Sequence, residues 1–234
     1  MQLHTKFGGR KFAMRRNGLV AFALGIMLSL PAVAGVLPKR EGMAEVSPGL
    51  WVDLAAKPET IARIRRDISG AERSVAKALG GIMRPEWRVC TTRACDRRNG
   101  YGPRGMTYGY SIVTITSQGA RSAGVFSHEL THVTLHAAIP PLGMLTGALP
   151  IWMDEGAAVL ISGEPVQAAD PAACKGRQVP LPRNHREFSR RSGVKGEGAL
   201  ALYVASTCAV RGWLAQGNTL RDMLPQLQQK GRLP

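Results

Sequence analysis

The sequence predicts an α+β fold in which strands come early and helices come late. Two short segments before residue 120, at 86–90 and 110–116, are rich in β-branched or aromatic residues, as strands are. Later segments repeat apolar residues at three- and four-residue spacing, which is typical of helices. This segregation along the chain favours α+β over an alternating α/β arrangement.

The first 34 residues have the pattern of a secretory signal peptide. Residues 1–18 carry five basic and no acidic side chains, and a twelve-residue apolar run follows at 19–30. Pro31 ends this run, and we expect cleavage after the Ala-x-Ala sequence that closes at Ala34. The run is shorter than the roughly twenty residues that span a bilayer. We therefore expect a periplasmic or secreted protein, and the alternative is an uncleaved anchor in the inner membrane.

The segment after the signal peptide is expected to be a linker. Glycines and prolines punctuate residues 35–57, with one short strand expected near 50–54. Pro58 suits the first position of a helix. Apolar residues at helical spacing continue this helix to Leu79, and Gly80 follows as a stop signal.

The central segment is expected to change from strands to a helix. Asn-Gly, Gly-Pro and Arg-Gly pairs predict turns at 96–105, between the two expected strands. Ser122 can cap a helix that continues to Ile139, because two prolines follow it.

The last third of the chain is expected to be helical around one long loop. Helices are predicted at 151–162, at 197–216 and from Asn218 to about Lys230. Residues 163–196 are expected to form a loop, because prolines, glycines and charged residues interrupt any apolar periodicity.

The four cysteines predict two disulfide bonds. An exported protein folds where disulfides persist, and an even number of cysteines favours full pairing. Of the three possible pairings we favour Cys90–Cys95 and Cys174–Cys208, because the first closes a tight loop and the second ties a loop to a later helix. The alternative is a four-cysteine zinc site, for which only the first pair has suitable spacing.

The net charge points to anionic surfaces rather than to nucleic acid. The whole chain carries +15, and removing the five basic residues before Ala34 leaves 26 basic and 16 acidic residues, a charge of +10. Such a protein is attracted to acidic lipids or cell-wall polymers. The basic residues are scattered and the aromatic content is only 6%, so specific nucleic-acid binding is not expected. We expect a monomer.

One stretch, FSHELTHVTLH at 126–136, holds three of the five histidines. His128 and His132 are four residues apart, which places both on one face of a helix about 6 Å apart along its axis. Two imidazoles in this arrangement can bind one zinc ion. Glu129 is turned by about 100° around the helix, where its carboxylate can act as general base towards an attacking water.

A catalytic zinc site needs a third protein ligand, for which the sequence offers two candidates. His136 lies too far along the helix to share an ion with His128, since eight residues span about 12 Å. We therefore expect His136 to be structural or to flank the site. Glu155, in PIWMDEGAAV, begins the next helix after a loop that can fold back, and small residues that allow close packing follow it.

His-Glu-x-x-His followed by Trp-x-x-Glu-Gly resembles the gluzincin zinc metallopeptidases, the group of thermolysin and aminopeptidase N. The resemblance covers residues 126–162 and implies that His128, His132 and Glu155 bind zinc while Glu129 is the base. It also implies a zincin-like metallopeptidase domain over 58–234. The sequence looks most similar to small peptidase-MA-like proteins of bacterial envelopes, which end in comparable helices.

Two departures from the family pattern limit what the resemblance implies. Twenty-two residues separate His132 from Glu155, more than in the best-known aminopeptidases, and their glycine-rich motif before the histidines is absent. Aminopeptidase specificity is therefore not carried over.

The resemblance also suggests roles around the zinc. In this family the strand before the zinc helix often binds extended substrate, which here would be 111–116. A transition-state donor often lies downstream, and Tyr203 is the first candidate and His185 the second. The alternatives are core packing for Tyr203 and solvent exposure for His185. Asp154 either orients a ligand or caps its helix.

These observations predict a zinc-dependent peptidase of the cell envelope that acts on a peptide or protein substrate. One alternative is a non-catalytic protein that uses zinc for stability and its charge for binding to the envelope. Another is a zinc hydrolase of a cell-wall amide, which would use the same groups.

Overall fold

A computed structural model of the protein describes residues 37–233, apart from 103, 141–142, 144–146, 177–178 and 194–197. The expected signal peptide and its cleavage site after Ala34 lie outside the described residues. From Pro38 onward the chain forms one compact unit. No helix in the described part of the chain combines the length and the apolar character that crossing a membrane requires.

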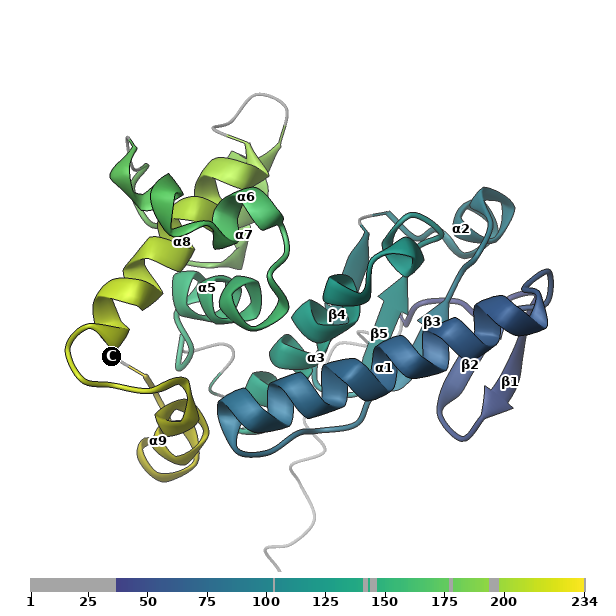
Figure 1. The fold of residues 1–234 in the computed structure, drawn as a ribbon, viewed down its shortest axis with the longest axis horizontal. Coiled ribbons are helices and arrows are strands. Elements are labelled where there is room, and N and C mark those ends of the chain that lie inside the picture. The colour runs from purple at the N-terminus through teal and green to yellow at the C-terminus, as the bar shows by residue number, and fades with distance from the viewer. Residues whose placement is uncertain are drawn as a thin grey trace, which may run out of the picture. The chain divides into compact units, whose positions relative to one another are not determined.

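Five strands in the described residues form one mixed sheet in the order β1-β2-β3-β5-β4 (Figure 1). The strands are β1 (Met43–Ser47), β2 (Leu50–Asp53), β3 (Glu86–Val89), β4 (Gly105–Tyr108) and β5 (Ile112–Ile115). The three inner strands β2, β3 and β5 are parallel to one another, whereas β1 and β4 pair antiparallel at the two edges. Together with the helices described below, this sheet confirms the α+β fold class.

The segment expected as a linker, 35–57, instead contributes a β-hairpin to the sheet. The strand expected near 50–54 is present as β2, but β1 precedes it and pairs with it. The glycine and proline that suggested a linker form the turn between the strands, where Gly49 has a positive φ of 74°. Val52 is fully buried, so the hairpin belongs to the core.

Helix α1 (Pro58–Leu79) and helix α3 (Ala123–Ala137) pack against each other and share one apolar core with the sheet. Ile64 and Val75 of α1 meet Phe126 of α3 and Val113 of β5 in this core, and all four are fully buried. Both helices follow the predicted pattern. The α3 helix ends two residues before the expected Ile139.

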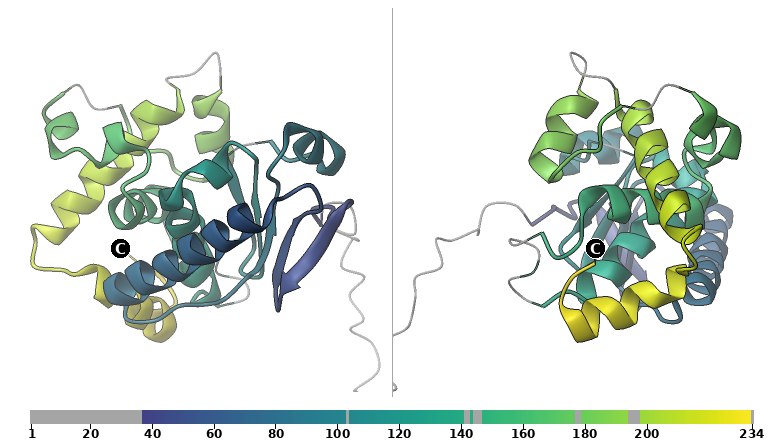
Figure 2. Two further views of the ribbon diagram at one scale, coloured as in Figure 1. Left: turned by 45° about the vertical axis from the view of Figure 1, so that its right-hand side comes forward. Right: turned by 90° about the vertical axis from the view of Figure 1, so that its left-hand side faces the viewer.

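The α-helices described after α3 make up most of the second half of the chain. They are α5 (Ile151–Ser162), α6 (Val166–Ala169), α7 (His185–Ser192), α8 (Ala199–Leu214) and α9 (Met223–Lys230). Helix α8 packs across α5, and α5 packs on α3 (Figure 2). The helices expected at 151–162, 197–216 and near the C-terminus are therefore present.

Two segments expected as loops contain short helices. Residues 163–196 include α6, α7 and a 3-10 helix, η2 (Pro171–Lys175), and the turns expected at 96–105 overlap α2 (Arg93–Asn99). The residues that suggested loops serve as helix caps: the Asn184 side chain accepts from the backbone N–H of Glu187 at the start of α7.

Both favoured disulfides, Cys90–Cys95 and Cys174–Cys208, are present, with Cα–Cα distances of 5.5 Å. The alternative zinc site made of four thiolates is therefore wrong, because every cysteine sulfur is bonded to another. The second disulfide ties η2 to the middle of α8.

Close packing of α5 on α8 gives a first prediction. A Cβ atom at Gly156 would lie 2.5 Å from the backbone oxygen of Ser206, which cannot move without shifting α8. We expect Gly156→Ala to lower the free energy of unfolding by about 2–3 kcal/mol, measured by urea denaturation. Gly212→Ala in α8 is the matched control, because no atom lies within 4 Å of its Cβ position. It should be neutral or stabilising by up to about 1 kcal/mol, and equal losses in both variants would contradict the packing argument.

Candidate functional site

The candidate site begins with the buried polar face of α3. The side chains of His128, Glu129, His132 and His136 are all buried, although three turns of one helix carry them. The rings of His128 and His132 lie 4.8 Å apart between centroids. Buried polar groups require partners, and the elements packed on α3 supply them.

The hydrogen bonds of His128 and His132 indicate which ring nitrogen of each residue carries a proton. His128 donates from Nδ1 to the backbone oxygen of Glu164 at 3.3 Å, and His132 donates from Nδ1 to Oδ1 of Asp154 at 2.7 Å. A ring that donates from Nδ1 can present the lone pair of Nε2 to a metal ion. Both Nε2 atoms are therefore available on the same side.

Glu155 of α5 faces these two nitrogens. Its Oε2 atom lies 3.5 Å from Nε2 of His128 and 3.5 Å from Nε2 of His132. This oxygen is buried and has no hydrogen-bond partner among the described residues. Two ligands bound tetrahedrally at 2.0–2.1 Å stand about 3.3 Å apart, so the three atoms are spaced as ligands of one ion rather than as hydrogen-bonded groups. The three residues fit a metal ion.

The electrostatics of Glu155 agree with this arrangement. Burial by itself raises the pKa of the Glu155 carboxyl, but His132 and His128 outweigh burial and lower the pKa to about 2. The carboxylate is therefore ionised and needs a positive charge beside it, from a protonated imidazole or from a bound cation.

Asp154 lies behind the site and holds two histidines. Its Oδ1 accepts from His132, and its Oδ2 accepts from Nε2 of His136 at 2.8 Å. His136 also donates from Nδ1 to the backbone oxygen of Gly109 at 2.9 Å. Because both nitrogens of His136 face acceptors, its ring carries two protons. Burial lowers the pKa of His136, and the charge of Asp154 more than restores it, for a net rise.

A second group of potential ligands, His132, His136 and Asp154, also lies close enough to hold an ion. Its separations of 2.7 and 2.8 Å are hydrogen-bond lengths, however, and its atoms already satisfy one another. We therefore assign the candidate metal position to His128, His132 and Glu155. His136 flanks this position, and Asp154 orients His132 rather than capping α5.

Glu129 lies on the cleft side of α3, next to the edge strand β4. Its Oε2 accepts from the hydroxyl of Thr107 at 2.8 Å. A Cβ atom at Gly105 would lie 2.5 Å from Oε1 of Glu129, so only glycine leaves room for this carboxylate. Sequence reasoning missed both Thr107 and Gly105. The only available signal was their segment, GMTYGYS, which matches no glycine-rich peptidase motif.

Tyr203 of α8 lies against His128, whereas His185 lines the same cleft beside His136. The Tyr203 ring stands perpendicular to that of His128 at 6.0 Å, and its hydroxyl makes no hydrogen bond to another described residue. Burial raises the pKa of this hydroxyl, and the carboxylates of Glu155 and Glu129 raise it further, so it stays protonated. His185 is exposed and lies 6.4 Å from the ring of His136, away from His128.

Two adjoining cavities of about 420 and 390 Å³ open the site to solvent. They share Gly105, His128, Glu129, Ala199 and Tyr203, so one cleft runs past the candidate metal position on both sides. Helix α7 and the start of α8 form one wall, and β4 forms the other.

The strand expected to bind substrate, 111–116, is in the wrong place for that role. It contains β5, which pairs with β3 on one side and β4 on the other and has no free edge. Strand β4 is one of the two edge strands of the sheet, and all but its last residue line the cleft. The error arose because β4 is only four residues long and its pairing partner cannot be read from local sequence.

Comparison of this chain with protein-family models, curated proteins and solved structures finds no match. Chemically, the site combines a potential three-ligand metal position with an ionisable carboxylate and a protonated phenol at one cleft. These are the groups that metal-assisted hydrolysis of a carbonyl compound requires.

The hydrogen bond from His132 to Asp154 gives the second prediction. Asp154→Asn can accept from only one histidine in the same way, so His132 loses its orientation and part of its basicity. We expect affinity for Zn²⁺ to fall about 10–100-fold, measured by competition with a chromogenic chelator. Asp67→Asn, which removes only the surface ion pair with Arg63, should leave the affinity unchanged. Unchanged affinity in Asp154→Asn would refute the orienting role.

Proposed function

We propose that this protein is a zinc-dependent peptidase of the gluzincin type, with a zincin-like fold, that hydrolyses peptide bonds in the cell envelope. The observation that carries the proposal is the buried, unpartnered Oε2 of Glu155, equidistant from Nε2 of His128 and His132. Such an atom is costly unless a cation occupies the space between the three groups.

The donor set favours zinc. Two imidazole nitrogens and one carboxylate oxygen form a three-ligand set that suits zinc and leaves a fourth position for water or substrate. A zinc ion held there would lower the pKa of a water molecule towards about 7 and polarise a substrate carbonyl.

In this proposal Glu129 transfers the proton, and Thr107 holds the Glu129 carboxylate in position. The Glu129 carboxylate borders both cavities, where it can accept a proton from the attacking water and return it to the leaving amine. Thr107 donates to one of its oxygens and so fixes its orientation. Without this hydrogen bond the carboxylate could rotate away from the cleft.

Tyr203 is the proposed donor to the developing oxyanion. Its hydroxyl is protonated and lacks another hydrogen-bond partner among the described residues. A donor that is already positioned stabilises negative charge on the carbonyl oxygen as water attacks.

The open edge of β4 supports a peptide as the substrate. An extended chain can add to this edge by backbone hydrogen bonds, as peptides do on other exposed sheet edges. Its side chains would then alternate between the cleft and solvent. The two cavities on either side of Glu129 offer room for the side chains beside the cleaved bond.

An envelope location rests on three observations. The first 34 residues have the pattern of a signal peptide, both cysteine pairs form disulfides, and the rest of the chain carries a net charge of +10. Disulfides persist in oxidising compartments, and a basic protein is attracted to anionic envelope polymers.

The third prediction distinguishes the role of Glu129 as general base from the role of Glu155 as metal ligand. Glu129→Gln should keep zinc but lose hydrolysis of a broad peptide library by at least about 100-fold, because the amide cannot accept the proton. Glu155→Ala should lose zinc as well, measured as bound metal per protein. Wild-type hydrolysis by Glu129→Gln would sink the mechanism. Parallel assays on purified cell wall distinguish a peptidase from a hydrolase of cell-wall amides, and no turnover on either substrate would favour a non-catalytic zinc protein.

The fourth prediction concerns the phenol of Tyr203. We expect Tyr203→Phe to lower kcat by about 100-fold with little change in KM, because the hydrogen bond is made mainly in the transition state. The aromatic contact with Phe188 at 5.5 Å remains in the variant, so stability should not change. If Tyr203 is only a packing residue, kcat will stay at the wild-type value.

A further inference from the structure

A separate cavity of about 290 Å³ lies at the carboxyl ends of the three parallel strands. Residues just after β2, β3 and β5 line it together with the first two turns of α1, among them Lys57, Thr60, Arg63, Thr92, Ser117 and Arg121. None of these residues lines the two cavities of the candidate active site. The crevice outside the carboxyl ends of parallel strands is a common place for ligands in open sheets.

Three basic side chains line this cavity, and two of them are unpartnered. Arg63 is held by Asp67 at 2.9 Å and by the backbone oxygen of Ala120 at 2.7 Å. Lys57 and Arg121 make no side-chain hydrogen bond or ion pair with another described residue. Lys57 precedes α1 and Arg121 precedes α3, so the two charges approach the cavity from different elements.

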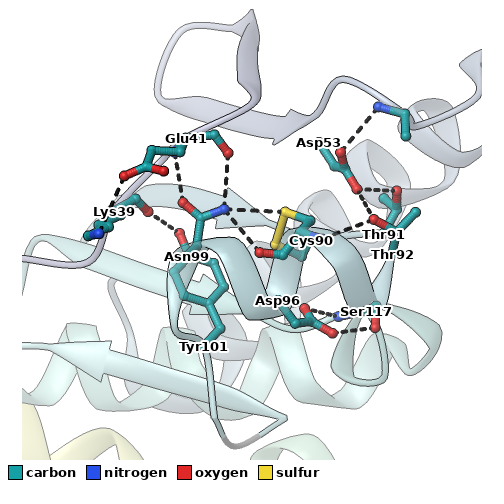
Figure 3. Close-up of a disulfide and its surroundings, with 12 residues drawn as sticks. Lys39, Glu41, Asp53, Cys90, Thr91, Thr92, Asp96, Asn99, Tyr101 and Ser117 are labelled. Carbon is teal, nitrogen blue, oxygen red and sulfur yellow. Dashed lines mark hydrogen bonds and ion pairs between the residues drawn. A yellow bond between two sulfur atoms is a disulfide. The ribbon is translucent and has the colours of Figure 1, made fainter.

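The two carboxylates near the cavity, those of Asp53 and Asp96, already accept hydrogen bonds from neighbouring groups (Figure 3). Oδ2 of Asp53 accepts from the hydroxyls of Thr92 at 2.6 Å and Thr91 at 3.3 Å, and its Oδ1 accepts from a backbone N–H. Asp96 accepts from both the backbone and the hydroxyl of Ser117. Neither carboxylate is among the residues that line the cavity. The cavity therefore presents cations and no carboxylate.

We propose that this cavity binds a phosphate group through Lys57 and Arg121. A phosphate offers several acceptor oxygens in a tetrahedral arrangement, which suits donors that approach from different sides, whereas a carboxylate offers two oxygens in one plane. Arginine and lysine both bind phosphate, arginine through two parallel N–H donors. The Thr60 hydroxyl, which lines the same cavity, adds a neutral donor. The phosphate is either free inorganic phosphate or the headgroup of an anionic phospholipid.

The test is titration of the purified protein with inorganic phosphate at low ionic strength, followed by calorimetry. The double variant K57Q/R121Q should bind phosphate about 10–100-fold more weakly than wild type, because charged hydrogen bonds of this kind are lost. R66Q/K77Q is the matched control: it removes the same two charges from exposed positions elsewhere on α1 and should bind phosphate within twofold of wild type. Equal weakening in both variants, or none in K57Q/R121Q, would overturn the site.

Vesicles distinguish the two sources of phosphate. Co-sedimentation with phosphatidylglycerol in phosphatidylcholine, compared with phosphatidylcholine alone, should be weakened by K57Q/R121Q and not by R66Q/K77Q if a lipid headgroup is the ligand. Phosphate titration that depends on Lys57 and Arg121 without such vesicle binding would assign free phosphate. Failure of both arms in the wild-type protein would overturn the proposal. These measurements do not involve peptide hydrolysis, so they stand whether or not the proposed peptidase activity is found.

Discussion

Contact between α3 and α5 brings two adjacent carboxylates against three imidazoles, and the site depends on this contact. Asp154 and Glu155 follow each other on α5, so their side chains leave the helix about 100° apart. Glu155 meets the Nε2 atoms of His128 and His132, while Asp154 accepts a hydrogen bond from Nδ1 of His132 from behind. One helix thus supplies both a candidate metal ligand and the group that orients another candidate ligand. Neither carboxylate could be buried here without the positive charge opposite it.

Two glycines bring the other functional groups within reach. Gly156 lets the backbone of α8 approach α5, which holds Tyr203 beside His128. Gly105 lets β4 lie against Glu129, so that Thr107 can bond to the carboxylate. In both places a Cβ atom would lie 2.5 Å from an oxygen atom, well inside van der Waals contact. The cleft geometry is therefore set by backbone approach as much as by side-chain chemistry.

The close approach of His128 and His132 could be predicted from sequence because helical spacing is local. Residues four apart on a helix share a face whatever surrounds them, so His128 and His132 could be paired and His136 set aside before any fold was known. Glu155 was a candidate because it begins the next helix after a loop that can fold back, and the resemblance to a second motif favoured it, since no local rule places it beside the histidines. Thr107 and the open edge of β4 could not be found this way, because strand register depends on partners distant in sequence. The short helices α2 and α7 were missed because their capping residues also occur in loops.

The two walls of the cleft are stabilised in different ways. The β4 wall pairs with β5, whose Val113 and Ile115 are buried in the main apolar core with α1 and α3. The α7 and α8 wall has a smaller cluster, in which Ile151, Phe188 and Leu202 are buried. A small cluster supplies less hydrophobic stabilisation, and here the Cys174–Cys208 bond ties α8 to η2 one turn beyond Tyr203. This bond limits the conformational freedom of the unfolded chain over 34 residues of sequence. It therefore adds stability to the wall that carries Tyr203, where the apolar cluster is small. The disulfide therefore supports the position of a functional group as well as the fold.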